Sequence, residues 1–142
     1  MDLALSISLS GMIAARDRLN IAAQNIANAG SSGALPDGPS GPTVPRPYTP
    51  LQIDQRPIPG GGTQAQAAPV EPRFTAAYEP DEPVADASGQ VAVPAVDLAS
   101  EALSVREASE AYRANARVFS VASAIDRETL DLLGPRRHDV SA

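Results

Sequence analysis

The sequence contains no cysteine, no tryptophan and no lysine, and aromatic residues make up only 4% of its 142 residues. Without cysteine the chain can form neither a disulfide nor a thiolate metal site, and it has no cysteine nucleophile. All eleven basic residues are arginine and the formal net charge is −6, which argues against nucleic-acid binding because that requires a basic surface. Much of the apolar 43% is alanine, so we expect one modest domain with a small core.

The chain also lacks a long apolar run. None reaches the roughly 18 residues of a membrane-spanning helix. The start, MDLALSISLSGMIAA, carries Asp2 where a secretory signal has positive charge, and serines interrupt its apolar residues. We therefore expect neither a membrane span nor a cleaved signal peptide.

Residues for catalysis are equally scarce. His138 is the only histidine, and it lies in a tail after Gly134 that is expected to be flexible. The acidic stretch EPDEPVAD lacks the alternating ligands around a glycine that a calcium loop needs, so a solvated loop is expected. The sequence predicts no enzyme activity, no cofactor, no metal site and no small-molecule substrate.

Residues 1–30 are expected to form a helix. Apolar residues recur at intervals of three, four and seven, the spacing of a helical seam: Leu5, Leu9, Met12, Leu19, Ala23 and Ile26. LALSISLS also alternates with period two, as in a strand, but the continuation through Arg18 favours a helix. Gly11 weakens it by about 1 kcal/mol relative to alanine, and Gly30 is expected to end it in the left-handed conformation.

Residues 31–96 hold thirteen of the fourteen prolines and the run GGG, which exclude long helices. Three short stretches favour extended structure: YTPLQID, PRFTAAY and GQVAVPAV. Phe74, Ala76 and Tyr78 alternate as on one face of a half-buried strand. We expect a small, loop-rich β element of one or two hairpins, with PDGPSGPTVP having the composition of a disordered segment.

Residues 97–134 are expected to form a second, longer helix, followed by the tail 135–142. Asp97 is a suitable N-cap, and Gly134 followed by Pro135 is a suitable stop. The helix would be on the order of 55 Å long, at about 1.5 Å per residue. It carries two apolar seams, one of Leu98, Ala102, Val105, Tyr112, Ala116 and Phe119, and one of Val118, Ala122, Ile125, Thr129 and Leu132.

One partner helix covers only one seam. The N-terminal helix is the expected first partner, in a coiled coil, so the second seam requires another copy or another protein. Arg113 and Arg117 are spaced i, i+4 and repel each other unless an acidic group of another chain lies between them. The fold class is therefore mainly α, with assembly through the helices.

Neutral amides stand on both helices. Asn25 and Asn28 share a face of the first helix, and Asn115 lies in the middle of the second. They are either surface amides or polar contacts between helices. A buried amide fixes register without the desolvation cost of a buried charge.

SGMIAARDRLNIAAQNIANAGSSG resembles the N-terminal signature of bacterial flagellar axial proteins, whose Asn-Ile-Ala-Asn-Ala core is matched by residues 25–29. The C-terminal half is similar to the FlgC family of proximal-rod proteins. The matching positions are Tyr78, Pro80, Pro83, Ala85, Gly89, Val91, Pro94, Val96, Ala111, Tyr112, Ala114 and Asn115.

The resemblance implies a structural subunit of the flagellar basal-body rod, which spans the periplasm and transmits torque. Its terminal helices would pack with copies of itself and with other rod proteins, Asn25 and Asn28 contacting neighbouring helices, and the β element would lie outside that layer. The flagellar type III export apparatus would secrete it without a cleaved signal. Two alternatives remain: the companion proximal-rod subunit, and a secreted coiled-coil binding module.

Overall fold

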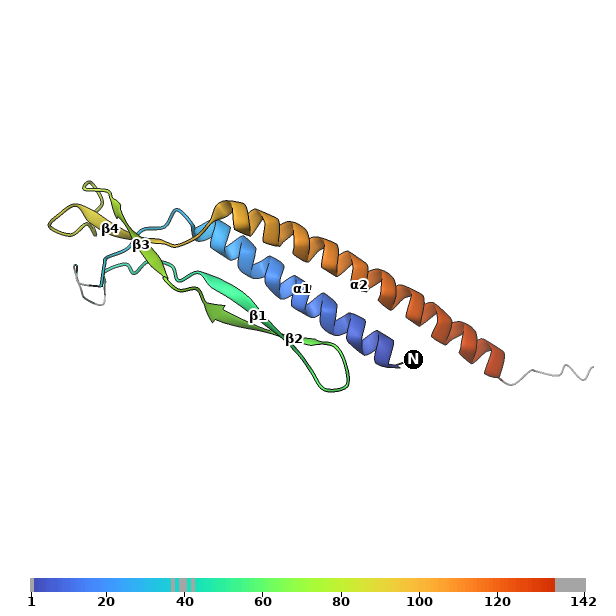
Figure 1. The fold of residues 1–142 in the computed structure, drawn as a ribbon. Coiled ribbons are helices and arrows are strands. Elements are labelled where there is room, and N and C mark those ends of the chain that lie inside the picture. Colours follow the sequence, from blue (N-terminus) through green and yellow to red (C-terminus); the bar gives the residue numbers. More distant parts are fainter. Residues whose placement is uncertain (1, 37, 39–40, 42, 135–142) are drawn as a thin grey trace, which may run out of the picture.

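The computed structural model has two long antiparallel helices at the ends of the chain and four short strands between them (Figure 1). It describes residues 2–36, 38, 41 and 43–134. The elements are α1 (Asp2–Asn28), β1 (Leu51–Pro57), β2 (Thr63–Pro69), β3 (Phe74–Tyr78), β4 (Gln90–Pro94) and α2 (Leu98–Leu133). The expected mainly helical architecture is confirmed. The tail with His138, and part of the stretch PDGPSGPTVP, lie outside the described residues.

The N-terminal end of α2 is capped by Asp97, as expected. Its carboxylate accepts hydrogen bonds from the Ala99 backbone N–H at 3.0 Å and from the Ser100 hydroxyl at 2.7 Å. The Ser100 hydroxyl, followed by the backbone N–H groups, lowers the pKa of Asp97 below its ordinary value. The cap therefore fixes where the 36-residue helix begins.

The C-terminal end of α1 differs from expectation in conformation, whereas α2 ends at Gly134 as expected. Gly134 ends α2 with φ −60° and ψ 152°, and its N–H donates to the Leu130 carbonyl at 2.8 Å. The following Pro135 favours this extended conformation over the left-handed one. Gly30 does not adopt a positive φ either. Instead, the Ser31 N–H and hydroxyl both donate to the Asn28 carbonyl, at 3.0 and 2.8 Å, and satisfy the end of α1.

The strands form two separate antiparallel hairpins. In the first, Leu51 lies opposite Pro69, and Gly60, Gly61 and Gly62 form the turn with positive φ. In the second, β3 pairs with β4. The strands β3 and β4 lie in the expected stretches, β1 begins in one and runs on past it to Pro57, and β2 was not expected. Within β3 the expected single face is wrong: Phe74 and Ala77 are half-buried, because β3 has one hairpin partner and no wider sheet to bury against.

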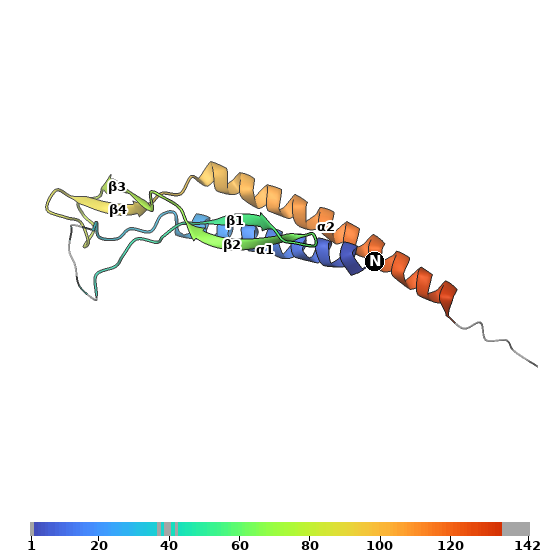
Figure 2. The ribbon, with the colours of Figure 1, turned by 60° about the horizontal axis from the view of Figure 1, so that its bottom comes forward.

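The two hairpins take different positions relative to the helices. The β1–β2 hairpin runs along α1, whereas the β3–β4 hairpin lies beyond the helix ends (Figures 1 and 2). Val91 and Ala92 of β4 are fully buried, and Ala92 exchanges two backbone hydrogen bonds with Gly33 at 2.8 and 3.0 Å. This bridge ties the chain after α1 to β4, directly before α2 begins.

Candidate assembly surface on the paired helices

The two helices pack against each other through small residues. On α1 the buried positions Ser8, Ala15 and Ala22 recur every seven residues. On α2 the buried alanines are Ala108 and Ala122. Small side chains allow helix backbones to approach closely, and seven-residue spacing keeps them on one face. Of these positions only Ala122 was among the seam residues expected from the sequence, because mainly larger apolar residues were taken as the seam.

Gly11 of α1 faces the side chain of Asn115 on α2. A Cβ built on Gly11 would lie 2.5 Å from Oδ1 and 2.7 Å from Nδ2 of Asn115. The Asn115 amide is itself held to its own helix, since Nδ2 donates to the Ala111 carbonyl at 2.9 Å. A larger residue at position 11 would therefore have to displace the Asn115 amide from this hydrogen bond, whereas glycine, despite its poor helix propensity, leaves the amide in place.

Asn25 is completely buried inside the subunit and connects three elements. Its Nδ2 donates to the Leu51 carbonyl of β1 and to Oε1 of Glu101 on α2, both at 2.7 Å. Its Oδ1 accepts from the Leu51 N–H at 3.1 Å and from the Tyr48 hydroxyl at 3.0 Å. Burial, and secondarily the Glu101 carboxylate, raise the pKa of Tyr48. Asn25 has no exposed surface, so it acts within the subunit.

Asn28 and Asn115 make local contacts instead. The Asn28 Nδ2 donates to the Gln24 carbonyl at 2.8 Å, one turn back on α1. Both side chains remain half-buried. The three amides thus differ: Asn25 bonds to elements distant in sequence, whereas Asn28 and Asn115 donate hydrogen bonds to carbonyl groups of their own helices.

The larger apolar residues lie at the edge of the helix pair or outside it. On α1, Leu5, Met12 and Leu19 are half-buried, and Leu9, Ala23 and Ile26 are exposed. On α2, Val105, Phe119, Ala116 and Thr129 are half-buried, and the exposed positions are Leu98, Ala102, Tyr112, Val118, Ile125 and Leu132. An extended set of exposed apolar residues along paired helices is typical of an interaction surface.

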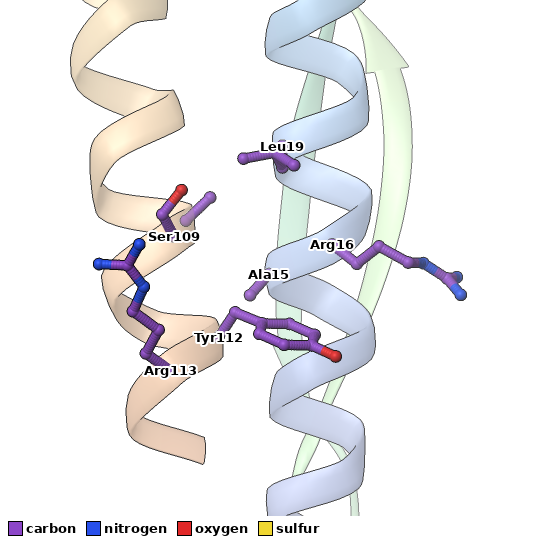
Figure 3. Close-up of a pocket in the computed structure, with 7 residues that line it drawn as sticks. Ala15, Arg16, Leu19, Ser109, Tyr112 and Arg113 are labelled. Carbon is purple, nitrogen blue, oxygen red and sulfur yellow. The ribbon is translucent and has the colours of Figure 1, made fainter. Parts of the chain in front are cut away.

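A groove of about 320 Å³ lies between α1 and α2, on the side away from the β1–β2 hairpin (Figure 3). Ala15 and Leu19 of α1 and Ala108 of α2 form its apolar walls. Tyr112 extends from α2 towards α1 across the groove, and Arg113 lies at its rim. The groove thus combines apolar surface with basic groups, which suits an amphipathic and acidic partner.

The C-terminal end of α2 extends beyond α1 (Figure 1). Asn25 contacts Glu101, and Gly11 lies opposite Asn115. The two helices are therefore antiparallel in a register in which moving one residue towards the N-terminus of α1 corresponds to moving one residue towards the C-terminus of α2. That register places Asp2 opposite Ala124, and leaves residues 125–133, about 14 Å of helix, without α1 beside them. Leu130, Leu132 and Leu133 in this overhang are 69%, 80% and 78% exposed.

Other candidate sites are already satisfied or absent in the described part of the chain. The Asp86 carboxylate accepts from the N–H groups of Ser88 and Gln90 and from the Ser88 hydroxyl, at 2.7–2.9 Å. The bond from Gln90, ahead of the others, lowers the pKa of Asp86. Residues 2–36, 38, 41 and 43–134 contain no group of three metal-ligating side chains, and neither helix is long and apolar enough to cross a membrane.

Comparison with known proteins identifies the family. No family model matches the chain. The flagellar basal-body rod protein FlgC of Salmonella typhimurium is 34% identical over 128 residues, covering 89% of this chain and 92% of the relative. FlgC of Aquifex aeolicus is 33% identical over 138 residues, and FlgC of Agrobacterium fabrum is 30% identical over 141 residues. These two matches cover 90% and 92% of this chain, and 93% of each relative. The chain belongs to the FlgC family of flagellar basal-body rod proteins.

Two stretches that carry the resemblance to the FlgC family lie in the helix pair. Residues 25–29 include Asn25, the buried amide that bonds to Leu51 and Glu101. Residues 111–115 include Tyr112 at the groove and Asn115, whose side chain faces Gly11. The residues missed from the sequence are the small ones and the partners of Asn25: Ser8, Gly11, Ala15, Ala22, Tyr48, Leu51, Glu101 and Ala108. Seven-residue spacing of small side chains is the signal that would have found four of them, Ser8, Ala15, Ala22 and Ala108.

Proposed function

We propose that this FlgC-family chain is a structural subunit of the flagellar basal-body rod, which assembles through its paired helices with copies of itself and with other rod proteins. The similarity to FlgC over about nine-tenths of the chain carries the proposal. The exposed apolar surface of α1 and α2 supports it, because a single chain leaves that surface open to water. Torque would pass through the packed helices, and no catalysis is involved.

We further propose that α1 and α2 form a coiled coil. The seven-residue spacing of Ser8, Ala15 and Ala22, and of Ala108, Asn115 and Ala122, supports this geometry. The β1–β2 hairpin packs on one side of α1 only, so the groove side and the overhang are available for neighbouring subunits.

Export through the flagellar type III apparatus without removal of the N-terminal segment is part of the proposal. Ser8, Gly11 and Ala15 belong to the helix interface, so cleavage of a signal-like segment would remove part of the fold. The mature subunit would reside in the periplasm-spanning part of the rod.

An in-frame deletion in the bacterium that encodes the chain tests the role. Basal bodies isolated from the deletion strain should lack the rod and everything distal to it in electron micrographs. The intact gene should restore both, and a gene lacking residues 97–133 should not. Normal flagella in the deletion strain would contradict the proposal and favour a secreted binding module.

A further inference from the structure

The overhang of α2 and the groove between α1 and α2 have complementary properties. The overhang, residues 125–133, carries three carboxylates, Asp126, Glu128 and Asp131, against one arginine, Arg127. In the described part of the chain, none of these four side chains takes part in an ion pair. This C-terminal segment of α2 is thus apolar, acidic and mostly exposed, with Asp126 and Thr129 half-buried.

The groove offers the opposite charge. Arg113 lies at its rim, and Arg117, one turn later on α2, lies outside the groove lining, beside a neighbouring hollow formed with Val118, Val121 and Ile125. Neither pairs with a carboxylate among the described residues, whereas Arg106 pairs with Glu110 at 3.1 Å. Two adjacent arginines on one face repel each other, so an acidic group of another chain would stabilise them.

These two surfaces cannot meet within one chain. The overhang is part of α2, and α2 also forms one wall of the groove. Ser109 in that wall is 20 residues from Thr129 in the overhang, which is about 30 Å along a continuous helix. The complementarity can therefore be satisfied only between two molecules.

We propose that the overhang of one subunit docks in the α1–α2 groove of a second copy of this chain, with its carboxylates facing Arg113 and Arg117. This inference rests on the proposed rod function. Because the two surfaces occupy different places on the subunit, the contact is heterologous. Repeated head to tail, a heterologous contact that does not close into a ring extends into a helical filament, which is the form a rod requires.

The absence of cysteine makes the contact directly testable by disulfide formation. The full chain carrying both Ser109→Cys and Thr129→Cys replaces the native gene, and isolated basal bodies are oxidised and run on a non-reducing gel. A head-to-tail contact should link chains in series into a ladder of dimers, trimers and larger species. Each single variant can give dimers at most, and the 30 Å separation prevents a bond within one chain.

The matched control combines Thr129→Cys with Ala114→Cys. Ala114 is exposed on the same helix, five residues from Ser109 and about 140° around it, so it faces away from the groove. The ladder from the Ser109 pair should exceed that from the Ala114 pair on the order of tenfold, because docking raises the local thiol concentration.

The outcomes separate this contact from the rod function. Motile cells with a ladder support the contact. Motile cells without a ladder, or with equal ladders from both pairs, overturn the contact and leave the rod function intact. A deletion strain with normal flagella would instead remove the rod function itself.

Charge reversal provides a test without thiols, should the two cysteines prevent rod formation. Arg113→Glu combined with Arg117→Glu should abolish swarming, whereas Arg106→Glu, at an arginine already paired on its own helix, should leave it unchanged. Adding Glu128→Arg and Asp131→Arg to the variant with both groove-side reversals should restore swarming. Unchanged swarming of the Arg113→Glu, Arg117→Glu variant, or no restoration by the reversed overhang, overturns the proposal.

Discussion

Gly11 and Asn115 meet across the α1–α2 interface, where a Cβ on residue 11 would lie 2.5 Å from the Asn115 Oδ1 and would push the amide aside. Gly11→Ala would favour the helix by about 1 kcal/mol, but overpacking costs about 1–3 kcal/mol. It would also displace the Asn115 amide from the Ala111 carbonyl. We expect a net loss of stability, measured by thermal unfolding of the purified chain.

Two controls isolate the steric cause. Gly30→Ala should not be destabilising in this way, because a Cβ there meets nothing within 4 Å. Combining Gly11→Ala with Asn115→Ala removes the obstacle and should recover stability beyond the sum of the single effects, with a coupling of about 1–2 kcal/mol. Strict additivity of the two changes would argue against the close contact.

The sequence predicted elements better than it predicted interfaces. Both helices, their ends and the Asp97 cap follow from periodicity and from end signals. The strand β2, TQAQAAP, was missed because glutamine and alanine give no strand signal, and its pairing depends on the glycine turn before it. The interface was misplaced because periodicity weights large residues, whereas this close approach selects Ser8, Gly11 and Ala15.

The role of Asn25 could not be predicted because its partners are distant in sequence. Leu51 and Glu101 lie 26 and 76 residues away, and only the fold brings them together. Leu132 is the converse case: its apolar pattern was visible in the sequence, but the structure leaves its side chain exposed.

Asn25→Ala should be the most destabilising single change on α1. It would leave buried hydrogen-bonding groups of Leu51 and Glu101 without their partner, at about 1–3 kcal/mol for each unsatisfied group. Asn28→Ala is the matched control, because it removes only a local bond to Gln24, and it should cost under about 1 kcal/mol. Denaturant unfolding of the two variants measures the difference. Equal midpoints would show that the buried hydrogen bonds of Asn25 add no more stability than the local hydrogen bond of Asn28.

The Asp97 cap should make stability depend on acidic pH. Its folded-state pKa is lowered, chiefly by the Ser100 hydroxyl, so the stabilisation is present above the unfolded pKa and is lost as pH falls through the folded pKa. Asp97→Ser keeps an acceptor at the cap but does not titrate there. The melting temperature of the native chain should therefore fall more than that of Asp97→Ser between pH 7 and about pH 2. Parallel declines would contradict a titrating cap.

The overhang should contribute to assembly but not to the stability of the single chain. Leu132 and Leu133 are 80% and 78% exposed, so replacing both with glutamine, which has a similar helix propensity, should change the free energy of unfolding by less than about 0.5 kcal/mol. Leu19→Gln is the contrasting variant, because Leu19 is half-buried against α2 at the groove and its replacement should lower the melting temperature.

Electron microscopy of basal bodies distinguishes a loss of assembly from a loss of stability of the single chain. The Leu132→Gln, Leu133→Gln chain should fold normally, as judged by circular dichroism, and yet fail to restore rods in the deletion strain, because its apolar surface serves only a neighbouring subunit. Complete rods from this chain would show that the exposed leucines have no partner in the filament. A lowered melting temperature would instead show that they stabilise the single chain, contrary to their exposure.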